Sequence, residues 1–167
     1  MFLKVGLLPV TENVFGMNVE FSGIILNMQQ QEMKRNRKKV LWIDADPLYI
    51  ERQKCVLSNK ELDCHLYSFN KMGEAFNFIE KQILEKNKKL HYIILDEKSI
   101  GKTLFPSSLE KFQGLNGFLK KPEIIVLTSE NNNQLRNCVM QYPSVSALLM
   151  KPVPPGYIEF LITGQVT

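Results

Sequence analysis

The sequence predicts an α/β protein with a doubly wound fold, in which five parallel strands in the order 2-1-3-4-5 form the middle layer of a three-layer sandwich. Two observations predict it. From residue 39 onward, short apolar segments alternate five times with segments of helical periodicity. The apolar segments are continuous runs rich in Val, Ile and Leu, which are typical of parallel strands covered by helices on both faces.

Each predicted element has a local reason in the sequence. An apolar run ends at Asp44, and Asp46 with Pro47 supplies an N-cap and a first helical position for the helix that follows. Ser107 and Glu110 have the spacing of a capping box and predict a later helix start. The expected strands are residues 40–43, 64–69, 91–95, 124–127 and 145–150, and the expected helices are residues 47–59, 71–86, 107–119, 131–141 and 155–162.

The first part of the chain breaks this alternating pattern. Its first 32 residues carry only four charged side chains and contain two weak strand-like runs, at residues 2–10 and 18–26. We therefore expect residues 1–37 to be an N-terminal extension and residues 38–167 to be the folded domain. Met33 is the expected natural start, which would make the residues before it dispensable.

Composition and charge exclude several classes of protein. The net charge is +4, and residues 33–39 hold five cations without base-reading or stacking side chains among them, so we expect a solvated run and no nucleic-acid partner. Three cysteines without CxxC spacing and two histidines argue against a zinc site and indicate reduced thiols in a cytoplasmic protein. No apolar run approaches the length of about 18 residues that a membrane span needs, so no membrane partner is expected.

Polar side chains follow four of the predicted strands. Asp44 comes after the first strand, Asp96 after the third, Thr128 and Ser129 after the fourth, and Lys151 after the fifth. The carboxyl ends of parallel strands meet at one edge of the sheet, where ligands of such folds bind. Carboxylates can hold Mg²⁺, an ammonium group and a hydroxyl can bind phosphoryl oxygens, and an aspartate can accept the phosphoryl group itself. The set predicts phosphoryl chemistry, although Thr128 and Ser129 taken alone are better explained as the cap of the next helix.

Four short motifs carry a resemblance to a known family. They are VLWIDADP at residues 40–47, YIILD at 92–96, IIVLTS at 124–129 and LLMKP at 148–152. In this order and spacing they resemble the receiver domain of two-component response regulators, in particular the single-domain, CheY-like members, whose fold is flavodoxin-like. The resemblance extends over about residues 39–163.

This resemblance implies a function and a set of site residues. Asp96 would accept a phosphoryl group from a histidine kinase or a phosphotransfer protein, Thr128 would contact that group, and Lys151 would pair with it. Asp44, Asp96 and the backbone carbonyl of Lys98 would hold Mg²⁺. The domain would be a stand-alone bacterial signalling phosphoprotein and no enzyme beyond its own phosphorylation and dephosphorylation. It would act by docking onto a downstream target protein, because no output domain follows.

The sequence departs from the family pattern at three places. Ala45 stands where the family has a second acid, which removes a metal ligand and is expected to weaken the Mg²⁺ site. Asp46, one residue later, is better explained as a helix cap. Leu148 replaces the aromatic residue often found three positions before the lysine, and residues 97–101 replace the usual Met-Pro loop. The resemblance also implies a cis peptide bond before Pro152.

Two other functions remain open. Ala45 favours a pseudo-receiver, which keeps the fold and binds partner proteins without phosphorylation. The Asp-x-Asp spacing after the first strand is also similar to that of haloacid-dehalogenase-like phosphatases, in which Asp44 would be the nucleophile and Asp46 the acid/base. That family needs further carboxylates after the lysine, and the only acid after Lys151 is Glu159, inside a predicted helix.

Overall fold

The computed structural model describes residues 24–28, 37–59, 64–101, 105–118 and 120–163. The chain divides into two units, residues 1–37 and residues 38–167. In the first unit, residues 24–28 form a short helix with exposed apolar side chains. The strand-like run expected at residues 18–26 is therefore wrong for its last three residues, whose consecutive apolar side chains have no alternation that favours a strand over a helix. The run at residues 2–10 lies outside the described residues.

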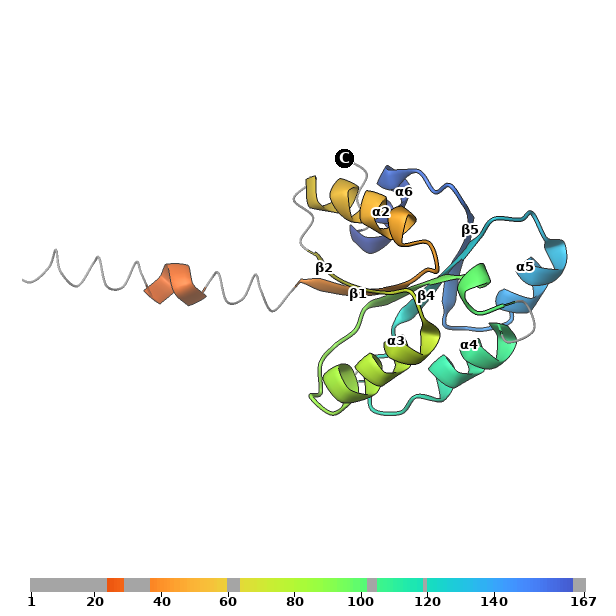
Figure 1. The fold of residues 1–167 in the computed structure, drawn as a ribbon. Helices are drawn as coiled ribbons and strands as arrows, with labels where there is room; N and C mark the ends of the chain where they lie inside the picture. Colours follow the sequence, from red (N-terminus) through yellow and green to blue (C-terminus); the bar gives the residue numbers. More distant parts are fainter. Residues whose placement is uncertain (1–23, 29–36, 60–63, 102–104, 119, 164–167) are drawn as a thin grey trace, which may run out of the picture. The chain divides into compact units, whose positions relative to one another are not determined.

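The second unit is built on a five-stranded parallel sheet (Figure 1). Its strands are β1 (Lys38–Ile43), β2 (Cys64–Phe69), β3 (Tyr92–Asp96), β4 (Glu123–Thr128) and β5 (Val145–Met150). They lie in the order β2-β1-β3-β4-β5, and each neighbouring pair is parallel. The predicted fold class and strand order are confirmed.

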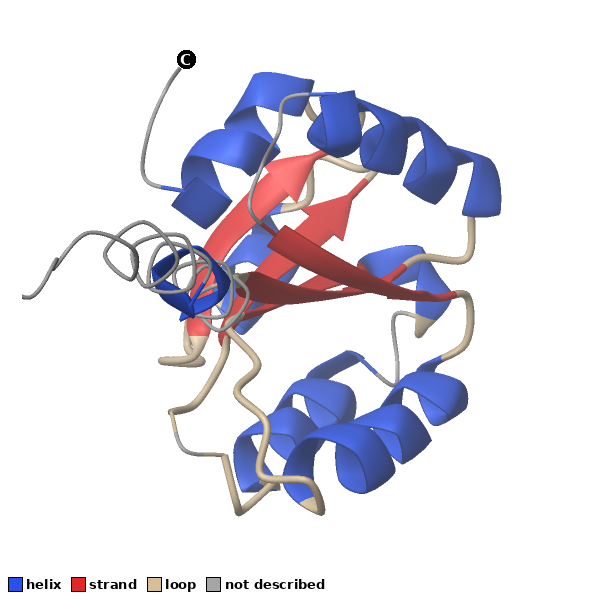
Figure 2. Ribbon diagram, turned by 90° about the vertical axis from the view of Figure 1, so that its left-hand side faces the viewer, coloured by secondary structure: helices blue, strands red, loops and turns tan. Residues whose placement is uncertain are grey.

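Helices cover both faces of the sheet (Figure 2). Strand β1 shows why both faces are apolar, since successive side chains point to opposite sides. Leu41 and Ile43 pack into the core cluster that includes α3 and α4, whereas Val40 and Trp42 pack into the cluster that includes α2 and α6. One face is covered by α2 (Pro47–Asn59) and α6 (Pro155–Thr163), and the other by α3 (Met72–Phe78), α4 (Phe105–Gly114) and α5 (Asn133–Val139).

Two helices differ from the sequence prediction. The helix expected over residues 71–86 is α-helical only to Phe78 and continues as a π-helical segment, η1 (Ile79–Leu84), in which the N–H of Glu85 donates to the carbonyl of Glu80. Hydrophobic spacing does not distinguish this wider turn from an α-helix, because Ile79 and Ile83 are buried in it as expected. The predicted capping box is wrong. Helix α4 begins before Ser107, at an apolar residue that is fully buried, and it ends at Gly114.

The sheet order places the ends of four strands at one edge. In the register of β3 and β4, Asp96 lies beside Leu127, and in that of β4 and β5, Thr128 lies beside Met150. Lys151 follows directly, and Asp44 follows the end of β1, which is the other neighbour of β3. The candidate site residues therefore share the carboxyl edge of the sheet. Within the described part of the chain, none of the helices has both the length and the apolar content needed to span a bilayer.

Candidate functional site

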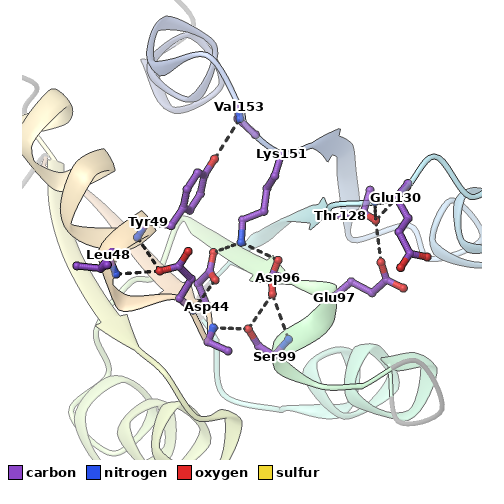
Figure 3. Close-up of polar contacts among 12 residues, drawn as sticks. Asp44, Leu48, Tyr49, Asp96, Glu97, Ser99, Thr128, Glu130, Lys151 and Val153 are labelled. Atoms are coloured by element: carbon purple, nitrogen blue, oxygen red, sulfur yellow. Dashed lines mark hydrogen bonds and ion pairs between the residues drawn. The ribbon is translucent and has the colours of Figure 1, made fainter.

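Three charged side chains meet at the carboxyl edge and form an ion-pair cluster, which we call the carboxylate–lysine triad (Figure 3). The Nζ atom of Lys151 lies 2.6 Å from Oδ2 of Asp44 and 2.9 Å from Oδ1 of Asp96. Both carboxylate side chains are buried, and that of Lys151 is 14% exposed. The ends of β1, β3 and β5 thus bring two acids and one ammonium group into direct contact.

The loop after β1 holds Asp44 and starts the next helix. The N–H of Asp46 donates to Oδ1 of Asp44 at 3.0 Å. Asp46 itself accepts from the N–H groups of Leu48 and Tyr49 at 3.0 and 3.1 Å through one carboxylate oxygen, which is the N-cap that the sequence predicts for α2. The Asp46 carboxylate is therefore used to cap the helix.

The backbone around Lys151 is fixed by its neighbours. Its N–H donates to the carbonyl of Thr128 at 2.7 Å, and the peptide bond to Pro152 is cis, as the resemblance implies. The Nζ atom also lies 4.4 Å from the centre of the Tyr49 ring, in cation–π contact. The hydroxyl oxygen of Tyr49 accepts from the N–H of Val153 at 3.1 Å, so one tyrosine from α2 holds both the side chain and the following backbone.

Asp96 has partners on both of its carboxylate oxygens. Oδ1 faces Lys151, and Oδ2 accepts from the N–H and from the hydroxyl of Ser99, at 3.1 and 3.0 Å. The Ser99 hydroxyl in turn accepts from the N–H of Ala45 at 2.6 Å, which ties the β3 loop to the β1 loop. Ser99 was not predicted from the sequence. The signal was an aspartate three residues before it, the N-cap spacing that here begins the short 3₁₀ helix η2 (Glu97–Ser99).

Thr128 is engaged by a second residue that the sequence analysis missed. Its hydroxyl donates to Oε2 of Glu97 at 2.7 Å and accepts from the N–H of Glu130 at 3.1 Å. Glu97 is buried, with 2% of its surface exposed, although it directly follows Asp96 at the carboxyl edge of the sheet. The cap of α5 is Asn132, which accepts from two helix N–H groups. The interpretation of Thr128 and Ser129 as that cap is therefore wrong, and the Thr128 hydroxyl bonds to Glu97 and Glu130 instead.

Burial and charge act in opposite directions on the triad. Burial raises the pKa of Asp44 above its usual value, and the contacts with Lys151 and with the N–H of Asp46 only partly offset this. Burial lowers the pKa of Lys151, but its hydrogen bonds to Asp44 and Asp96 outweigh burial and leave the pKa raised. The lysine therefore carries its positive charge at neutral pH, where it faces the two carboxylates.

Solved structures with the same fold are found at low sequence identity. A two-component response regulator from Legionella pneumophila gives a TM-score of 0.61 at 17% identity, over 77% of this chain and 99% of the other. A CheY-like receiver domain protein from Methanospirillum hungatei gives 0.56 at 18% identity, over 77% and 93%. A Burkholderia pseudomallei response regulator, solved with a phosphorylated aspartic acid, a calcium ion and citrate, gives 0.57 at 17% identity, over 75% and 66%. This chain has the receiver fold. No family model and no curated protein matches the sequence.

The receiver fold brings together most, but not all, of the expected site residues. Asp44, Asp96 and Lys151 are in contact, and Thr128 ends the neighbouring strand with its hydroxyl bonded to Glu97. Lys98 is exposed, and the metal contact expected of it uses its backbone carbonyl and not its side chain. Thr128 can therefore donate a hydrogen bond to a phosphoryl group only after it stops donating to Glu97, because a hydroxyl has one proton to donate.

The donor set suits a weakly held Mg²⁺. The candidate ligands are the carboxylates of Asp44 and Asp96 and the carbonyl of Lys98, and Ala45 offers only a methyl group. Among the described residues, no three acidic, histidine or cysteine side chains gather as a metal site. Mg²⁺ commonly keeps several waters and uses one or two carboxylates together with phosphate oxygens, so this set fits. The Lys151 ammonium group already lies against both carboxylates and would compete with the ion for them.

Proposed function

We propose that this chain is a receiver domain that accepts a phosphoryl group on Asp96 from a histidine kinase or a phosphotransfer protein, in a bacterial phosphorelay in the cytoplasm. One observation carries the proposal: the buried Asp96 at the end of the central strand lies 2.9 Å from Lys151, which also contacts Asp44. A carboxylate beside an ammonium group suits phosphoryl transfer to aspartate, because the carboxylate can act as the nucleophile and the ammonium group can neutralise phosphoryl oxygens. The domain then acts by docking onto a downstream protein.

The transfer step balances with these residues. A carboxylate oxygen of Asp96 attacks phosphorus, an oxygen–phosphorus bond forms, and the phosphorus–nitrogen bond of the donor phosphohistidine breaks. The donor imidazole keeps the electron pair and takes a proton from water. Lys151 neutralises the phosphoryl oxygens, and Thr128 donates a hydrogen bond to one of them. Mg²⁺ held by Asp44, Asp96 and the Lys98 carbonyl would supply further neutralisation of charge.

The contacts of Asp96 set a condition on this step. Both carboxylate oxygens are engaged, one by Lys151 and the other by two groups of Ser99. A carboxylate has about four lone-pair sites and three are used here, so attack by Oδ2 needs one Ser99 contact to be exchanged, which we expect to happen when the donor binds. The same observation, together with Ala45, favours a second function, a pseudo-receiver that binds its partner without phosphorylation.

One experiment separates the two functions. We expect acetyl phosphate with Mg²⁺ to add one phosphoryl group to the protein, seen by intact mass spectrometry, and mild alkali to remove it because acyl phosphates are base-labile. Asp96→Asn should abolish the label. The matched control is Asp46→Asn, which keeps a good helix cap and should be labelled like the wild type.

Two results would contradict the phosphoacceptor proposal. Persistence of the label in Asp96→Asn would assign it to another residue. Absence of any label in the wild type, together with NMR spectra that do not respond to beryllofluoride, would assign the chain to the pseudo-receivers. The phosphatase alternative is not proposed, because the Asp46 carboxylate caps α2 and Asp44 is held by Lys151.

A further inference from the structure

The opposite edge of the sheet gathers lysines. Two consecutive lysines precede or begin each of three strands, and β1, β3 and β4 are neighbours in the sheet. Parallel strands start at the same edge, so pairs that are far apart in the sequence come together there. The pairs are Lys38 and Lys39, Lys88 and Lys89, and Lys120 and Lys121. The basic run noted in the sequence ends in the first of these pairs.

These lysines surround a hollow of about 70 Å³. Its charged lining residues are Lys38, Lys89, Lys120, Lys121 and Glu123, and the titratable rings of His91 and Tyr92 complete the polar lining. The lining therefore contains four lysines and one acid. Among the described residues, none forms an ion pair with these four lysines, and one polar contact of their side chains is found there, from Lys121 to the carbonyl of Gln113. The positive charge of the hollow is thus not neutralised by the described part of the chain.

His91 is held as a hydrogen-bond donor within this hollow. Its Nδ1 accepts from the N–H of Lys39 at 2.9 Å, so in the neutral ring the proton lies on Nε2. Its backbone is fixed as well, since its N–H donates to Lys39 and its carbonyl accepts from Glu123, both at 2.9 Å. Burial lowers the pKa of His91 to about 4, and the nearby Lys89, Lys38, Lys39 and Lys120 add to the effect. The ring is therefore neutral at physiological pH, and the positive charges of the nearby lysines oppose its protonation.

We propose that this hollow binds the phosphate group of a small ligand, either inorganic phosphate or a phosphate monoester. The lysines supply the charge, and the Nε2–H of His91 donates a hydrogen bond to a phosphate oxygen. The small volume favours one tetrahedral anion over a polymer, which needs a groove that follows its backbone. The site lies at the other edge of the sheet from Asp96 and does not depend on the proposed phosphoacceptor function.

The test is an NMR titration of the full chain with sodium phosphate at constant ionic strength. We expect saturable shifts confined to residues 38–39, 88–92 and 120–123 and to the His91 ring. The double variant Lys120→Gln/Lys121→Gln should weaken binding at least about tenfold, or about 1.4 kcal/mol. Glu123→Gln should strengthen it about twofold, because it removes the one acid of the lining. The control Lys81→Gln/Lys86→Gln changes the net charge equally and should bind like the wild type.

The outcomes decide the proposal. Shifts that do not saturate, or an equal loss in the control variant, would show nonspecific attraction and overturn it. Binding of a short single-stranded oligonucleotide at these residues, without binding of phosphate, would assign the surface to nucleic acid and also overturn it. A parallel titration with glycerol phosphate distinguishes the sources: tighter binding than phosphate indicates a monoester, and equal or weaker binding indicates the free anion. Spectra of each variant check that it is folded.

Discussion

The two edges of one parallel sheet treat charge in opposite ways. At the carboxyl edge, two buried acids contact one half-buried lysine, and each carboxylate also accepts a backbone hydrogen bond. At the amino edge, exposed lysines surround a small hollow, and they form no ion pair with the described residues. The difference follows from the topology, since all strand ends meet at one edge and all strand starts at the other. Acids that follow strands and lysines that precede them are thereby separated by the length of the strands.

The comparison teaches where a single change should matter. A buried charge that loses its partner keeps the full cost of its desolvation, whereas an exposed charge is solvated and screened. Changes at the carboxyl edge should therefore alter stability and chemistry strongly. Changes at the amino edge should alter ligand binding and pH dependence with little effect on the fold.

The largest expected effect is the loss of Lys151. Lys151→Met leaves two buried carboxylates without a cation, and the free energy of unfolding at pH 7 should fall by about 3–5 kcal/mol. The loss should shrink as the pH falls toward the ordinary aspartate value of 3.8, because protonation of Asp44, whose pKa is already raised, removes the repulsion. Urea denaturation measures it, with the exposed Lys86→Met as control. A loss below about 1 kcal/mol would show that water replaces the lysine.

The next change restores the missing acid. Ala45 is exposed and its N–H is already bonded to Ser99, so Ala45→Asp adds a third carboxylate without disturbing the core. We expect Mg²⁺ affinity to rise by about tenfold, because Mg²⁺ prefers oxygen ligands of negative charge. Trp42 fluorescence can report it, since this buried ring contacts Tyr49, whose own ring lies against Lys151. Ala45→Asn is the neutral control, and equal gains in both variants would contradict the role of charge.

A smaller effect is expected at Glu97. Its carboxylate accepts a hydrogen bond from the Thr128 hydroxyl at 2.7 Å. This hydrogen bond must be exchanged before Thr128 can donate to a phosphoryl group. Glu97→Gln keeps an acceptor but removes the charge that strengthens the bond. We expect the rate of labelling by acetyl phosphate to rise about threefold to tenfold, as about 1 kcal/mol less is lost in the exchange. An unchanged labelling rate would show that the hydrogen bond to Glu97 does not limit the contribution of Thr128 to phosphoryl transfer. Thr128→Ala gives the labelling rate without any Thr128 hydroxyl.

Most of the fold was predictable because it depends on local patterns. Continuous apolar runs gave five strands, and Asp46 with Pro47 gave the start of α2 as observed. The contact of Asp44, Asp96 and Lys151 was also predictable, since the topology alone brings strand ends together. The Ser99 and Glu97 contacts were not predicted, because they depend on how one short 3₁₀ turn directs its side chains.

The amino edge shows the opposite limit of sequence reasoning. The basic run at residues 33–39 predicts a solvated segment, and Lys38 is exposed, but the sequence by itself does not show that its last two lysines share an edge with pairs about 50 and 80 residues away. The predicted strand order already implies that these lysine pairs share one edge. This is recognised only when the residues before each strand are examined together, as the residues after each strand are for the carboxyl edge. The π-helical segment in η1 is different in kind, because hydrophobic spacing does not encode it.

At the amino edge, His91 should shape the pH dependence of stability. Its pKa is about 4 in the folded protein against an ordinary value of 6.5, so the unfolded chain takes up a proton first as the pH falls. Protonation of His91 should therefore leave the free energy of unfolding unchanged above about pH 6.5. As the pH falls from 6.5 to 4, it should lower this free energy progressively. His91→Asn, whose carbonyl can still accept from Lys39, should remove this part of the slope in urea titrations. A slope that stays the same in His91→Asn would contradict this prediction.

The smallest expected effect concerns the chain before the amino edge. We predict that residues 1–32 are dispensable, because the alternating pattern begins after them and, among the described residues, the core clusters are formed by residues from 38 onward. A chain that starts at Met33 keeps all six lysines of the amino edge. It should unfold cooperatively, with a Tm within a few degrees of the full chain and with the same affinity for phosphate. A large drop in Tm would show that the first residues pack on the domain, and a loss of phosphate binding alone would show that they complete the hollow.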